Sequence, residues 1–103
     1  MTEKNNGDRR ILLSMKQYLV LKTIEEMGGR DIYYSQIVAR MNNKITWAHA
    51  VRILKEFEKM GIINTAKMGR VRIIELTDKG KRLIKLADEI AELLQPVGEA
   101  STE

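Results

Sequence analysis

One side of a segment between positions 48 and 59 carries the side chains best suited to chemistry in this chain. At about 100° per residue of a helix, Ala48, Arg52, Lys55 and Lys59 project together. An arginine fork can bond both acceptors of a guanine edge, lysines attract phosphates, and a small residue near the helix start allows close approach to bases. We therefore predict that Arg52 contacts a base and that Lys55 and Lys59 contact phosphates. The alternative is an ordinary solvated helix face.

Residues at the start of the same segment extend this surface. His49 and Val51 lie beside the basic side chains, and both are candidates for nucleic-acid contact. Thr46 stands where the helix begins, and its hydroxyl can donate to a phosphate there. Trp47 falls between the two sides of the helix, so we interpret it as a packing residue and not as a base-stacking one.

A second group of cations lies in a predicted hairpin. Arg70 and Arg72 share a strand face by the period of two, and Lys67 lies on the partner strand. Long cations near a hairpin tip suit a narrow minor groove, where the negative potential attracts arginine. The alternative is that these charges only protect an edge strand from unwanted pairing.

The charge distribution agrees with a polyanionic partner. Residues 40–85 hold twelve Lys or Arg and four Asp or Glu, a net charge of +8, whereas the remaining residues hold six and ten, a net charge of −4. A basic middle between acidic ends indicates that one region of the chain meets the polyanion. Charges that merely solvate helix faces remain the alternative.

Composition excludes most enzyme and metal chemistry. The chain of 103 residues has no cysteine and one histidine, His49, with no carboxylate cluster beside it. It also lacks a phosphate-binding glycine loop. We predict one domain, no enzymatic activity, no cofactor and no metal site. The absence of an apolar run near 20 residues and the polar start, Met1–Asp8, predict a cytoplasmic, nucleoid-associated protein without a membrane segment.

Sequence periodicity and capping signals place these side chains on a small number of elements. The predicted elements are a helix from Ser14 (capping box with Gln17) to Gly28, a short strand Asp31–Tyr34, a Ser35-capped helix Gln36–Asn42, a helix Thr46–Met60, strands Ile62–Lys67 and Arg70–Leu76 around Met68-Gly69, and a helix from Thr77 or Asp78 to Gln95. Three helices followed by a hairpin predict an α+β, mostly α, winged helix-turn-helix. We assign 11–77 to this domain, 78–95 to a C-terminal dimerisation helix, and 1–10 and 96–103 to flexible tails.

The last predicted helix displays more apolar surface than a small core needs. Its stripe recurs at spacings of three and four, and part of it fits a coiled-coil seam. Exposed apolar stripes usually mark interfaces, so we predict a homodimer, with a contribution of Ile11, Leu12 and Leu13 left open. The alternative is packing on its own domain only. The predicted interface residues are Leu83, Leu86, Ala87, Ile90, Leu93 and Leu94.

Two motifs resemble the MarR-like branch of winged-helix regulators, especially its small archaeal members, over Ser14–Leu86. They are Ile45–Ile63 (ITWAHAVRILKEFEKMGII) and Ile74–Leu83 (IELTDKGKRL). The resemblance implies a homodimer that reads a two-fold symmetric DNA site, often as a repressor. It also implies that Ala48, His49, Val51 and Arg52 face the groove and that Arg70 lies in the wing. Met68 departs from the family pattern, which has an acidic residue at that position.

Together these features predict a sequence-specific double-stranded DNA-binding regulator, a homodimeric repressor. Its recognition helix, 46–60, would lie in the major groove and its wing, 67–72, at the minor groove. Two alternatives remain open: a sequence-neutral chromatin protein, and a winged-helix protein-interaction module of a transcription or replication assembly. The sequence identifies no small-molecule effector.

Overall fold

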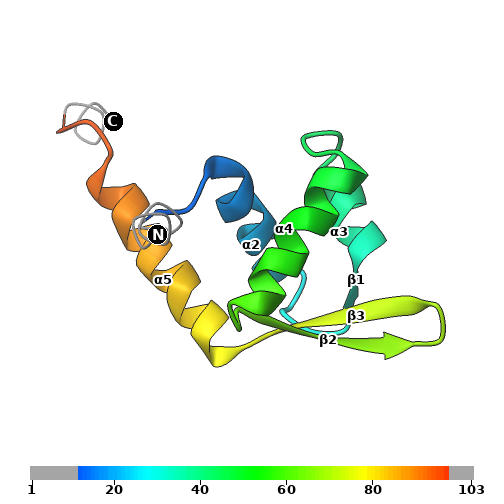
Figure 1. Ribbon diagram of the computed structural model, residues 1–103. Helices are drawn as coiled ribbons and strands as arrows, with labels where there is room; N and C mark the ends of the chain where they lie inside the picture. Colours follow the sequence, from blue (N-terminus) through cyan, green and yellow to red (C-terminus); the bar gives the residue numbers. More distant parts are fainter. Residues whose placement is uncertain (1–11, 98–103) are drawn as a thin grey trace, which may run out of the picture.

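The computed structural model describes residues 12–97, and the element order within them confirms the predicted winged helix-turn-helix (Figure 1). Ile11 and the predicted tails, apart from Pro96 and Val97, lie outside the described residues. The elements are α2 (Met15–Glu26), β1 (Ile32–Tyr33), α3 (Tyr34–Arg40), α4 (Trp47–Lys59), β2 (Ile63–Met68), β3 (Val71–Leu76) and α5 (Asp78–Leu93).

Three helices begin with a side-chain cap, and two of these caps, Ser14 and Thr77, lie where the sequence predicts a capping residue. At the start of α2 the Gln17 backbone N–H donates to Ser14 Oγ (3.1 Å), and the Ser14 backbone N–H donates to Gln17 Oε1 (2.9 Å). Thr46 accepts a hydrogen bond from the backbone of α4, and Thr77 does the same for α5. Each cap satisfies a backbone donor that has no partner within the helix.

Several predicted boundaries differ from the structure by one or two residues, and two of the differences have a clear physical cause. Helix α3 begins at Tyr34 and not after Ser35, because the Gln36 side chain accepts from the Tyr33 backbone (2.8 Å) and closes the helix start earlier. The hairpin turn is Gly69-Arg70 and not Met68-Gly69, since Met68 still pairs with Val71. Gly69 has φ +64° at the first turn position, a conformation that glycine adopts without strain.

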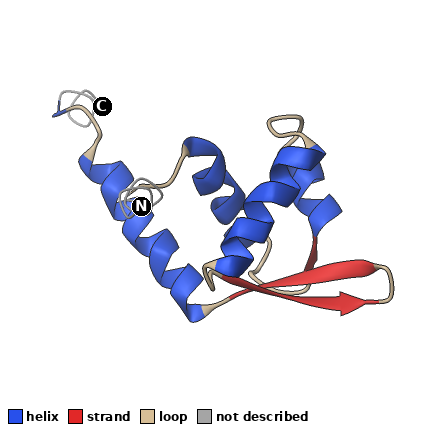
Figure 2. Cartoon of the chain, in the orientation of Figure 1, coloured by secondary structure: helices blue, strands red, loops and turns tan. Residues whose placement is uncertain are grey.

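The strands form one antiparallel sheet in the order β1-β3-β2 at the base of the helices (Figure 2). Ile32 of β1 pairs with Ile74 of β3, and Ile63 of β2 pairs with Leu76 of β3. The base of the hairpin is therefore held on both sides of β3, while the outer half extends beyond the core as the wing (Figure 1).

The core lies between the three N-terminal helices and the inner face of the sheet. Helix α4 contributes the four apolar residues predicted from its wheel, Ala50, Ile53, Leu54 and Phe57, all of which are buried. Each of the other helices and strands also contributes at least one fully buried side chain, and in α5 this residue lies in the first half of the helix. These side chains include Leu21, Ile24, Ile32, Ile37, Ile63, Ile74 and Ile84. This packing fixes which side of α4 faces solvent.

Helix α5 leaves the base of the wing and passes α2 on the side away from the wing tip (Figure 1). Its Asp88 accepts a hydrogen bond from the Tyr18 hydroxyl (2.6 Å) and pairs with Lys22 (3.0 Å), so polar contacts join α5 to α2. The Tyr18 hydrogen bond, followed by that from Lys22, lowers the pKa of the Asp88 carboxyl. The carboxylate form therefore holds the middle of α5 against α2.

Gly80 gives a prediction about stability. A Cβ at this buried position would clash with the Ile62 carbonyl oxygen and come within 2.8 Å of Leu76 Cδ1. Alanine normally favours a helix over glycine by about 1 kcal/mol. We expect overpacking to exceed that gain, so that Gly80→Ala lowers the free energy of unfolding by about 1–3 kcal/mol in denaturant titration. Lys81→Ala, on the exposed side of the same turn, is the control and should be nearly neutral. A Gly80→Ala protein as stable as the control would contradict the packing at this position.

Candidate nucleic-acid interface

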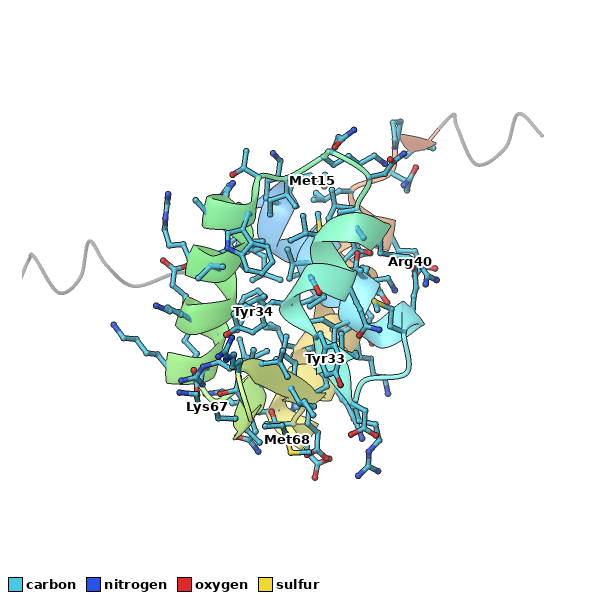
Figure 3. All side chains as sticks on the ribbon, turned by 90° about the vertical axis from the view of Figure 1, so that its right-hand side faces the viewer. Met15, Tyr33, Tyr34, Arg40, Lys67 and Met68 are labelled. Atoms are coloured by element: carbon cyan, nitrogen blue, oxygen red, sulfur yellow. The ribbon has the colours of Figure 1, made fainter. Side chains whose placement is uncertain are left out.

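The side of α4 opposite the core is open to solvent along its whole length. Ala48, Arg52, Lys55 and Lys59 are all exposed, as their shared position on the helix requires. Figure 3 shows the exposed side chains of α4 pointing to the left, away from the helices behind it. The surface predicted to meet a polyanion is therefore not covered by the protein's own packing.

The first turn of α4 combines a cap with an aromatic pair. Thr46 Oγ1 accepts from the His49 backbone N–H (3.1 Å), which leaves the hydroxyl proton free to be donated elsewhere. Trp47 is 52% exposed, and its ring centroid lies 6.4 Å from that of Tyr34 in a tilted arrangement. Trp47 thus packs on α3 with one side while the other side remains open. His49 and Val51 are half-buried.

Two cations of the wing, Lys67 and Arg72, lie on the same side of the molecule as α4. Lys67 and Arg72 are directly opposite in the strand register, on the sheet face that also carries Thr65 and Ile74. In Figure 3 Lys67 lies at the side of α4, whereas Arg40 lies at the opposite side of the molecule. Like charges opposite each other destabilise a sheet, so this pair is better suited to an anionic partner than to a free hairpin.

Arg70 and Arg72 do not share a strand face as predicted, because Arg70 occupies the turn. Arg70 is exposed at the wing tip. Arg72 is also exposed, but its Nη1 donates to Thr65 Oγ1 (2.7 Å) and lies 4.0 Å from Glu58 Oε2. Thr65 in turn donates to Glu58 Oε2 (2.7 Å).

Glu58 and Thr65 were not predicted from the sequence. Their link joins residues seven apart that belong to the end of α4 and the start of the wing. The only available signal was that Thr65 shares the period-two strand face with Lys67. That signal does not reveal a contact between a strand and a helix.

Most of the predicted interface residues of α5 are accessible. Leu86 and Ile90 are exposed, and Leu93 and Leu94 are 83% and 74% exposed. Ala87 is half-buried, and so is Leu83, which packs partly against the core. Leu12, at the other end of the described chain, is exposed as well. Among residues 12–97, no helix combines the length and the apolar character needed to cross a membrane.

Comparison with known proteins agrees with this architecture, although no family model matches the chain. An uncharacterised protein of Archaeoglobus fulgidus is 32% identical over 92 residues, which cover 85% of this chain and 95% of that protein. A crystal structure of an Archaeoglobus fulgidus protein superimposes with a TM-score of 0.68 at 30% identity, covering 82% of this chain and 93% of its own.

Larger proteins share the fold. A transcriptional regulator of the MarR family from Rhodococcus superimposes with a TM-score of 0.65 at 23% identity, over 75% of this chain. This chain spans only 54% of that regulator's length. The chain has the winged helix-turn-helix fold that is also found in MarR-family regulators, and it belongs to the same family as the Archaeoglobus fulgidus protein.

Proposed function

We propose that the protein is a sequence-specific double-stranded DNA-binding transcriptional regulator that acts as a homodimeric repressor. The observation that carries this proposal is that the open basic side of α4 and two cations of the wing, Lys67 and Arg72, lie on one side of the molecule. Duplex DNA is a polyanion with a groove that admits a helix, so it matches both the charge and the shape of this surface.

In the proposed complex α4, with its cap at Thr46, lies in the major groove. Arg52 in the middle of the helix bonds a base edge, and Ala48 and Val51 allow close approach there. Lys55, Lys59 and the Thr46 hydroxyl contact phosphates. At the minor groove Lys67 and Arg70 supply cations from the wing. Arg72 lies next to them in the wing, bonded to Thr65. His49 borders the base-contacting residues.

Two copies are proposed to associate through α5. The exposed apolar side chains of its outer half are Leu86, Ile90, Leu93 and Leu94, and Leu83 and Ala87 continue the stripe toward the core. A two-fold dimer buries the same surface on both copies and presents two recognition helices to a palindromic site. We place the protein on the nucleoid in the cytoplasm and expect no catalytic activity.

Selection of bound duplexes from a random pool tests this function. We expect enrichment of one two-fold symmetric sequence. Affinity for that sequence should fall steeply with salt, with a logarithmic slope of about −0.9 for each phosphate contacted. Steep salt dependence without enrichment would favour the sequence-neutral chromatin protein. Binding that is weak and nearly independent of salt would instead favour the protein-interaction module.

A further inference from the structure

The outer half of the wing is joined to the protein by very little apolar packing. Every residue from Ala66 to Arg72 is exposed, and burial resumes at Thr65 on one strand and at the half-buried Ile73 on the other. A two-stranded ribbon by itself is marginally stable in water. The position of the wing tip relative to α4 therefore depends on contacts made where burial ends.

At that boundary lies the chain of polar contacts that we name the wing clasp, formed by Glu58, Thr65 and Arg72. Arg72 donates to the Thr65 hydroxyl and Thr65 donates to the Glu58 carboxylate, both at 2.7 Å. Arg72 also lies 4.0 Å from the same carboxylate oxygen. The clasp joins the last turn of α4 to both strands of the wing.

The Glu58 carboxylate also lies close to a pair of like charges in the hairpin. Lys67 and Arg72 face each other across the two strands with the same charge. Glu58 Oε2 lies 4.0 Å from Arg72 Nη1, so its negative charge offsets part of the repulsion between Arg72 and Lys67. Lys67 has no such carboxylate among the ion pairs of residues 12–97.

We propose that Arg72 is a positioning residue, which sets the angle between wing and recognition helix through the clasp, and that Lys67 and Arg70 make the wing's phosphate contacts. This inference rests on the proposed DNA-binding function. A fixed angle matters only when helix and wing must both fit one particular site. Random DNA can be bound by either element alone, so the clasp contributes to the preference for the selected sequence.

Thr65→Val tests the clasp without changing any charge. It removes both hydrogen bonds of the hydroxyl, while Thr65→Ser retains them and serves as the matched control. We expect Thr65→Val to weaken binding to the selected duplex about three- to tenfold, the cost of ordering one or two mobile side chains on binding. Binding to a random duplex and the salt slope should be unchanged. Thermal unfolding of both variants checks that the fold is retained.

A second comparison separates positioning from phosphate contact. Arg72→Gln and Lys67→Gln remove the same charge from opposite strands. Loss of a phosphate contact lowers the steepness of the salt slope by about 0.9. We expect that change for Lys67→Gln and not for Arg72→Gln.

Two results would overturn the inference: Thr65→Val binding the selected duplex as tightly as Thr65→Ser, or Arg72→Gln lowering the salt slope as Lys67→Gln does. Failure of the proposed function is distinguishable, because the wild-type protein would then either enrich no sequence from the random pool or bind no duplex with salt-dependent affinity. Binding by the wild-type protein is therefore measured before that of any variant.

Discussion

Arg52→Ala is expected to weaken binding to the selected duplex by about 1–3 kcal/mol and to relax the preference at one base pair of each half-site. Arg52 is exposed in the middle of α4, with the small residue Ala48 one turn before it. A planar guanidinium at this place can bond both acceptors of a guanine, and no other base pair offers the same pattern. Repeating the duplex selection with the variant measures both effects.

Arg40→Ala is the matched control, since Arg40 is an exposed arginine on the opposite side of the molecule (Figure 3). It removes the same charge, so any effect of net charge alone appears in both variants. The control should retain the full base preference. Arg52 would lose its proposed role if its variant selected the same sequence as the control with equal affinity.

Replacement of Ile90, Leu93 and Leu94 by glutamine is expected to convert the dimer to a monomer. Burial of one such side chain contributes about 1.5 kcal/mol or more to the free energy of association. Because the dimer is two-fold symmetric, each substitution removes this contribution from both copies. The summed loss is on the order of the whole free energy of a micromolar dimer, about 8 kcal/mol. Sedimentation equilibrium should show the mass falling by half. Leu83 is left unchanged because it packs partly against the core.

Met68→Gln combined with Val71→Thr is the control for that experiment. Both positions are exposed and apolar, but they lie on the wing. The control protein should remain dimeric. If the α5 variant also kept its dimer mass, the helix would have to be assigned to packing on its own domain, and the proposed two-fold complex would lose its basis.

The parts of this fold that could be predicted from the sequence are those set by local periodicity. The spacing of Ala50, Ile53, Leu54 and Phe57 leaves only one side of α4 for the basic residues, and burial in the structure follows that spacing. Caps at Ser14, Thr46 and Thr77 are likewise local, since each side chain bonds a backbone group three residues away. Such signals need no knowledge of the tertiary arrangement.

Features that depend on register or on distant contacts could not be predicted in the same way. The turn at Gly69-Arg70 differs from the expected turn by one residue, and this shift alone removes Arg70 from the strand face of Arg72. The Glu58–Thr65 hydrogen bond joins a helix to a strand, and sequence spacing does not encode it. Amphipathicity predicted the apolar side of α5 but did not separate Leu83, which meets the core, from Leu94, which does not.

Mapping of backbone amide chemical shifts during titration with the selected duplex tests the central claim most directly. We expect the largest changes along the open side of α4, from Thr46 to Lys59, and at the wing tip around Arg70. The side of the protein that carries Arg40 should show little change. Changes confined to α5 or to the Arg40 side, with α4 unaffected, would contradict the placement of DNA on the recognition helix.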